Sequence, residues 1–136
     1  MSIQNDIWKS VKDIILANVK SLNNKLFFED EQVQVGEYYM TAEWGLSRFD
    51  EVGTAMRQRI TPLILTLYKK KGARSKDLNV YEIADTIAYN IPRYNAPIWY
   101  FAQPDSFENE VDKEGYIGFI LTINFYTAEC ATDLGV

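Results

Sequence analysis

Apolar side chains recur with helical spacing in two parts of the chain. Over residues 3–19 they fall at steps of three and four, which places them on one side of a helix. Residues 80–91 keep the same spacing behind Asn79 and Glu82, which fit an N-cap pair, and Pro92 ends the pattern. The sequence therefore predicts two amphipathic helices, at residues 3–19 and 79–91. The apolar positions of the first are Ile3, Ile7, Trp8, Val11, Ile14, Ile15 and Val19.

The clearest strand pattern covers residues 116–127. Every odd position from 117 to 125 is apolar, so we expect one face of this strand to lie in the core. The aromatic stretch 97–103 predicts another strand, ended by Pro104. The acidic segment 105–114 separates the two strands, and we expect them to form a hairpin with a long loop.

Two more strands are predicted in the first half of the chain. Residues 32–40 alternate in polarity, and residues 62–69 are dense in strand formers behind Pro62, which a strand tolerates at its first position. Residues 41–59 fit either a short helix or an extended arm. This order of elements predicts an α+β fold, a single domain of residues 1–136. Its largely antiparallel β-sheet is covered on one side by two helices, and an arm or loop protrudes.

The composition excludes several kinds of chemistry. A chain of 136 residues can bury a core without disulfides or metals. It has no histidine and a single cysteine, Cys130, so histidine-based catalysis, an internal disulfide and multi-cysteine metal sites are excluded. The carboxylates Glu82 and Asp85 share a helix face, where we expect a solvated helix edge. We therefore expect a protein that is not an enzyme and that holds no cofactor or metal.

Charged residues are segregated along the chain. The formal net charge is −5. Seven bases and no acid lie between Arg57 and Lys76, whereas five acids and one base lie between Asp105 and Glu114. Both segments could be solvated loops. They could also pair between identical subunits of a ring, or the basic segment could line a channel through which nucleic acid passes. The candidate contact residues are Lys69, Lys70, Lys71, Arg74 and Lys76 on the basic side, and Glu108 and Glu110 on the acidic side.

Aromatic residues make up 14% of the chain, more than one small core needs. Because aromatic residues and arginine are enriched at protein interfaces, Trp44, Arg48 and Phe49 are candidates for a contact arm within residues 41–59. The alternative is that these side chains pack within their own subunit.

Two further expectations concern location. No apolar run approaches the roughly 18 residues that would suggest a membrane span. The N-terminus lacks the basic start and apolar core of a secretory signal, so we expect synthesis in a cytoplasm.

Five features in this order carry a family resemblance. They are the N-terminal amphipathic helix, the run 62–70, the helix 80–91, the aromatic strand 98–101 and the closing strand 116–126. In this order of elements the chain resembles the tail-terminator (tail-completion) proteins of tailed bacteriophages. The resemblance is one of element order and rests on no signature motif.

The resemblance implies a structural protein of the virion, assembled in the host cytoplasm. Such a protein forms a homo-oligomeric ring, commonly a hexamer, on the last ring of the tail tube. It ends tube polymerisation and offers its other surface to the head-side connector. Residues 41–59 would then reach across subunits, and the basic segment 69–76 would face a neighbour, the tube or DNA in the lumen. The alternatives are another phage neck or head-completion protein, and a small acidic binding module of the immunity or inhibitor type.

Overall fold

Two helices and six strands make up the described part of the chain. The computed structural model describes residues 3–29, 36–51, 56–70, 79–93, 101–109 and 115–130. The helices are α1 (Ile3–Asn18) and α2 (Val80–Arg93), with a 3-10 turn η1 (Lys20–Leu22) after α1. The strands are β1 (Leu26–Phe28), β2 (Tyr38–Trp44), β3 (Arg48–Glu51), β4 (Met56–Lys70), β5 (Phe101–Asn109) and β6 (Tyr116–Cys130).

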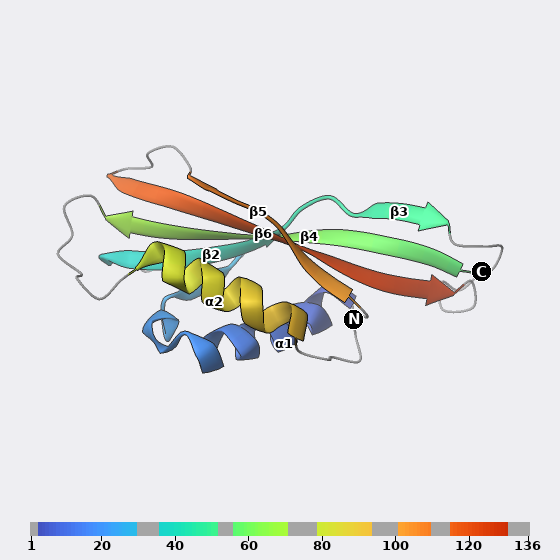
Figure 1. The fold of residues 1–136 in the computed structure, drawn as a ribbon, viewed down its shortest axis with the longest axis horizontal. Helices are drawn as coiled ribbons and strands as arrows, with labels where there is room; N and C mark the ends of the chain where they lie inside the picture. Colours follow the sequence, from blue (N-terminus) through green and yellow to red (C-terminus); the bar gives the residue numbers. More distant parts are fainter. Residues whose placement is uncertain are drawn as a thin grey trace.

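The strands form one sheet in the order β1-β2-β4-β6-β5, and β3 pairs with β4 beyond the end of β2. Among the described strands, β1 and β2 run parallel and the other pairs are antiparallel. β4 and β6 pair along their full 15 residues, so these two strands form the centre of the sheet. Both helices lie on one face of the sheet (Figure 1). The predicted α+β fold is therefore confirmed.

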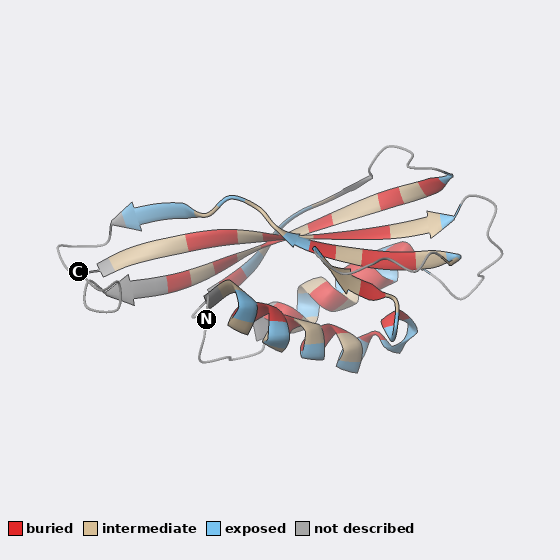
Figure 2. Cartoon of the chain, turned by 180° about the vertical axis from the view of Figure 1, so that it is seen from behind, coloured by how far each residue is buried: buried red, intermediate tan, exposed pale blue. Residues whose placement is uncertain are grey.

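The core lies between the helices and the sheet (Figure 2). The predicted apolar stripe of α1 is buried at each position from Ile7 to Val19, and in α2 the residues at helical spacing from Val80 to Ile91 are buried or half-buried. They face the odd positions of β4 and β6, where Phe125 is among the largest side chains with no exposed surface. The central buried strand residues are Leu63, Leu65, Leu67, Leu121, Ile123 and Phe125.

A smaller aromatic cluster joins four strands on the opposite face of the sheet. Tyr39 stacks on Tyr68 with ring centroids 4.9 Å apart, and its edge contacts with Tyr116 and Phe27 measure 5.5 and 6.5 Å. The Tyr116 hydroxyl donates a 2.6 Å hydrogen bond to the carbonyl oxygen of Gly36. Because successive strand residues face opposite sides, Tyr39 lies here while Met40 lies in the helix-side core. Part of the aromatic surplus thus packs within the chain itself.

Helix boundaries agree with the prediction to within two residues, but several strand boundaries differ. The predicted strand 32–40 overlaps β2 only at residues 38–40, because β2 begins at Tyr38, and its pairing with β4 continues to Trp44. Residues 30–35 lie outside the described part of the chain. The open segment 41–59 contains the end of β2, all of β3 and the start of β4. β1 was not predicted.

Two strand boundaries that were predicted from proline are wrong, the start of one strand and the end of another. β4 begins six residues before Pro62, and β5 continues through Pro104 to Asn109, so residues 105–109 are strand and not loop. β5 is an edge strand with a register shift between Pro104 and Ser106, a place where proline is tolerated. Residues 97–100 of the predicted strand lie outside the described residues. β6 confirms the predicted strand 116–127 and extends it to Cys130, and its pairing with β5 confirms the predicted association of the two strands.

Candidate subunit-contact surfaces

One end of the sheet extends past both helices (Figure 1). This extension contains β3 and the neighbouring ends of β4 and β6, with Arg48 opposite Ile60 and Glu51 opposite Arg57. We call residues 45–51 and 57–60 the arm. The arm falls largely within the segment that the sequence left open, and it includes two of the predicted contact residues, Arg48 and Phe49.

The base of the arm is held by a close contact between its entry and β4. The Gly45 N–H donates to the carbonyl oxygen of Pro62 at 2.8 Å. In an antiparallel ladder the N–H and C=O of one residue point to the same side of the strand. The missing N–H of Pro62 therefore faces residues 45–47, where neither β2 nor β3 pairs with β4. A Cβ atom on Gly45 would lie 2.7 Å from Cγ of Pro62. Glycine and proline therefore allow β4 to exchange one neighbouring strand for another without a break in its ladder with β6.

Two apolar side chains of the arm face solvent. Leu46 is 96% exposed and Phe49 is 47% exposed. The guanidinium carbons of Arg57 and Arg59 lie 4.3 and 5.4 Å from the centroid of the Phe49 ring, within the range of cation–π attraction. The arm thus presents an apolar surface bordered by two arginines.

Polar contacts order the arm beside these side chains. Nε of Arg59 donates to the Ser47 hydroxyl at 3.1 Å, and that hydroxyl lies 2.9 Å from the hydroxyl of buried Thr61. On the other face of β3, Arg48 forms an ion pair with Asp50 at 3.8 Å. Because both side chains of this pair are exposed, it contributes at most about 1 kcal/mol.

Trp44 packs against the core of its own chain. Its ring meets that of Phe125 edge to face at 6.0 Å, and its backbone N–H donates to Oε1 of Glu29 at 2.6 Å. The buried indole N–H has no hydrogen-bond partner among the described residues. The structure therefore separates Trp44 from Arg48 and Phe49, the residues with which the sequence grouped it.

The basic and acidic segments leave the same end of the sheet. β4 ends at Lys70 opposite Tyr116, and β5 ends at Asn109 opposite Phe119, so a single strand, β6, separates the two ends. Of the predicted basic contact residues, half-buried Lys69 and exposed Lys70 are described, and on the acidic side the side chain of Glu108 is not. Lys71, Arg74, Lys76 and Glu110 lie outside the described residues. The strand ends at Lys70 and Asn109 are therefore near neighbours within one chain, and their positions do not favour pairing of the charged segments between chains over pairing within one.

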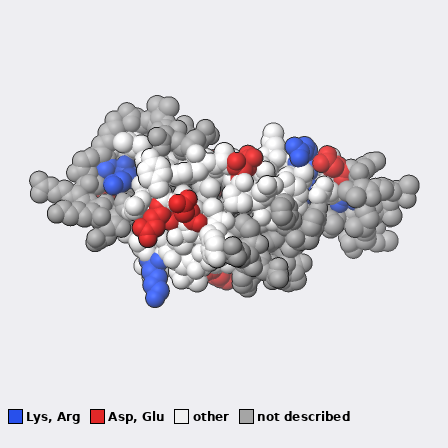
Figure 3. All heavy atoms as spheres, in the orientation of Figure 1, with Lys and Arg blue, Asp and Glu red and all other residues white. Residues whose placement is uncertain are grey.

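A second exposed surface lies along α2. Tyr81, Asp85 and Tyr89 follow one another at four-residue steps, so they share one side of the helix, and the two tyrosines are 59% and 58% exposed. Tyr81 is supported from below by edge contacts with Phe107 and Phe119 at 5.8 and 6.0 Å. Acidic groups gather over the first half of α2, where Glu82 and Asp85 lie (Figure 3). We call Tyr81, Glu82, Asp85 and Tyr89 the α2 face.

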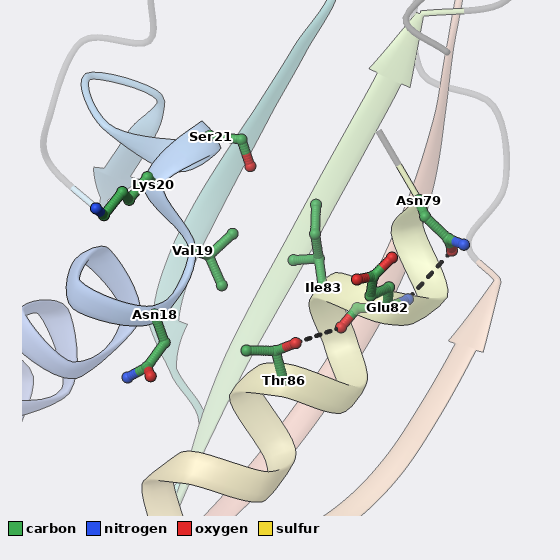
Figure 4. A pocket seen from close by; sticks show the side chains of 8 residues that line it. All are labelled: Asn18, Val19, Lys20, Ser21, Asn79, Glu82, Ile83 and Thr86. Atoms are coloured by element: carbon green, nitrogen blue, oxygen red, sulfur yellow. Dashed lines mark hydrogen bonds between the residues drawn. The ribbon is translucent and has the colours of Figure 1, made fainter. Parts of the chain in front are cut away.

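A pocket of about 210 Å³ lies between the end of α1 and the start of α2 (Figure 4). Its polar side chains are largely occupied by their own helices. Oδ1 of Asn79 accepts the backbone N–H groups of Tyr81 and Glu82, Nδ2 of Asn18 donates to the carbonyl of Ile14, and the Thr86 hydroxyl donates to the carbonyl of Glu82. These hydrogen bonds are local to the two helices. Among the residues that line the pocket, no set of reactive side chains converges on one point.

Sequence reasoning named Arg48 and Phe49 as contact residues, which stays a prediction. It did not place Leu46, Arg57 and Arg59 as their surface neighbours, and it treated Glu82 and Asp85 of the α2 face as a solvated helix edge. The four-residue steps from Tyr81 through Asp85 to Tyr89, opposite the buried isoleucines of α2, were the available signal. Within the described ranges no group of three potential metal ligands is found, and no helix there is long and apolar enough to cross a membrane. Comparison with models of known protein families gives no match, and comparison with curated proteins gives none either.

Proposed function

We propose that this chain is a structural protein that assembles with copies of itself into a ring. In this proposal the ring caps the tail tube of a bacteriophage, ends its polymerisation and joins it to the head-side connector. The order of elements supports the phage role, and the exposed surfaces support the assembly.

One observation carries the assembly part of the proposal. Among the described residues, the large apolar side chains that remain exposed fall into two places, Leu46 and Phe49 on the arm and Tyr81 and Tyr89 on α2. A ring of identical subunits needs two different, complementary surfaces on each chain, since every subunit meets one neighbour with each of them. A binding module with a single partner needs only one such surface.

The proposal is tested by particle mass and shape. Light scattering and native mass spectrometry are expected to show a species several times the 15.7 kDa of one chain. Electron micrographs of the same sample are expected to show rings with a central hole, and purified tail tubes should bind the protein at their ends. A 15.7 kDa monomer at every concentration, combined with no binding to tubes, would contradict the proposal. A monomer that binds one other protein tightly would instead support the binding-module alternative.

A further inference from the structure

We infer that the arm of one copy docks on the α2 face of a second copy. This inference rests on the self-assembly in the proposed function and names the two surfaces that meet. The occupant of the α2 face is thus residues 45–51 and 57–60 of another molecule of the same chain.

The arm has the properties of an anchor for such a contact. Leu46 is almost fully exposed, and its connection is held at Gly45 by the bond to Pro62 and at Ser47 by the contacts with Arg59 and Thr61. Phe49 lies within cation–π range of two arginines. Because the backbone on either side of Leu46 and the Phe49 ring are already held in place, docking the arm costs less conformational entropy than docking a free loop would.

The α2 face is also ordered before any contact forms. The Tyr81 ring meets Phe107 and Phe119, whose own rings stack with centroids 6.4 Å apart, so an exposed tyrosine is fixed on a rigid base of β5 and β6. Fixed, amphipathic tyrosine rings are frequent anchors of protein interfaces.

The chemistry of the two surfaces is complementary. The α2 face adds Glu82 and Asp85 to its tyrosines, while the arm places Arg57 and Arg59 beside Phe49. Carboxylates can accept from the guanidinium groups at the edge of the contact, and the exposed tyrosine rings can meet Leu46 and Phe49 at its centre. Two such surfaces attract each other, whereas α2 against α2 would bring like charges together.

A single molecule cannot make this contact with itself. The arm extends from the end of the sheet beyond the helices, and α2 lies over the other half of the sheet (Figure 1). The donor and acceptor surfaces therefore belong to different molecules, and a docked pair keeps one arm and one α2 face for further neighbours.

Two variants that each lose one surface test the inference. Leu46→Ser with Phe49→Ser removes the arm's apolar surface without emptying the core, because both side chains are exposed. Asp85→Arg places a positive charge opposite the arm. Asp13→Arg is the matched control, because it makes the same charge reversal at an exposed position of α1 outside the α2 face. Circular dichroism melts confirm that each variant is folded.

Analytical ultracentrifugation then compares each variant alone with their equimolar mixture. Each variant alone is expected to have a dissociation constant raised about 30-fold or more, the loss typical of a hot-spot residue. The mixture retains one intact contact, the arm of the Asp85→Arg chain on the α2 face of the other, and should give a one-to-one dimer of twice 15.7 kDa. The Asp13→Arg control should assemble as the unmodified protein does.

Three outcomes would overturn the inference. They are an unchanged assembly of either single-surface variant, a mixture that stays monomeric, and an unmodified protein that is monomeric up to about 1 mM, where even a contact with a Kd near 1 mM is populated. The phage-tube role is decided separately by the binding of the unmodified protein to tube ends. An unmodified protein that stops at a dimer of twice 15.7 kDa would support the docking but contradict the ring.

Discussion

At the scale of single residues, Phe125 and Leu46 lie at the two extremes of burial. Phe125 has no exposed surface and meets Trp44 edge to face, whereas Leu46 is 96% exposed. The two side chains are similarly apolar, so their different positions assign them different roles. Phe125 contributes to the stability of the subunit, and Leu46 is available for contact with another molecule.

Truncation of these two residues should separate stability from assembly. Phe125→Ala leaves a cavity in the core and is expected to lower the free energy of unfolding by about 3–5 kcal/mol. Leu46→Ala is expected to change it by less than about 0.5 kcal/mol, because it removes no packing. Urea unfolding followed by circular dichroism measures both values. Equal losses for the two variants would contradict the assignment.

Asn79 begins α2 by accepting two backbone N–H groups. Its Oδ1 lies 3.1 Å from the nitrogen atoms of both Tyr81 and Glu82, so the Asn79 half of the predicted capping pair is confirmed. Asn79→Ala is expected to lower the free energy of unfolding by about 1 kcal/mol, while Asn79→Asp, which keeps an acceptor, should retain it. Amide hydrogen exchange at Tyr81 and Glu82 should accelerate in the alanine variant alone. Equal exchange rates in the two variants would show that the cap does not protect this turn.

At the scale of elements, the exchange of β2 for β3 beside β4 determines where the arm begins. Residues 45–47 lie between the β2–β4 ladder and the β3–β4 ladder and belong to neither. The hydrogen bond from Gly45 to Pro62 joins them to β4. The arm is therefore a continuation of the sheet, since β4 and β6 run through its base without interruption.

Two glycine substitutions test how tightly this base is packed. In Gly45→Ala the new Cβ would lie 2.7 Å from the Pro62 ring, and the expected loss is about 1–3 kcal/mol, as for other overpacked sites. Gly36→Ala is the matched control. Its Cβ would approach only Nζ of Lys25, at 2.9 Å, and this flexible side chain can move away at little cost. Comparison of the two urea midpoints gives the result, and a control as destabilised as Gly45→Ala would contradict the packing argument.

The sequence predicted elements well where a single interaction determined them. The helical stripe beginning at Ile7 faces one core, and the odd positions of β6 face the same core, so periodicity identified both. It predicted poorly where pairing partners decided the outcome. Pro62 suggested the start of a strand because it lacks an N–H for the ladder. The missing N–H is tolerated inside β4 because it faces residues 45–47, and these are distant in the sequence. Leu46 and Phe49 were hard to assign because exposure depends on which neighbours the sheet brings close.

At the scale of the whole molecule, the proposed assembly depends on the charges of particular surfaces more than on the net value of −5. The arm carries Arg57 and Arg59 beside an apolar patch, and the α2 face carries Glu82 and Asp85 between tyrosines. A contact between these surfaces combines a screened electrostatic part with an apolar part that salt does not weaken.

Self-association should therefore depend on salt in a characteristic way. Raising NaCl from about 0.01 to 1 M shortens the Debye length from about 30 to 3 Å, and the dissociation constant is expected to rise over this range. In Asp85→Asn the dissociation constant should be higher at low salt and should change less with NaCl. Sedimentation at a series of salt concentrations provides the measurement. An association of the unmodified protein that is constant across the series would contradict an electrostatic contribution at the α2 face.

The ladder between β4 and β6 also has a consequence for the time the chain needs to fold. It joins Lys70 to Tyr116 and Met56 to Cys130, residues far apart in the sequence, and β6 follows all the other described elements along the chain. Topologies dominated by such distant pairs fold in milliseconds to seconds, more slowly than helical bundles. A ribosome adds about 5–20 residues per second, so β4 waits several seconds with one edge unpaired until β6 is made. The growing chain is therefore most exposed to aggregation in the interval between the synthesis of these two strands.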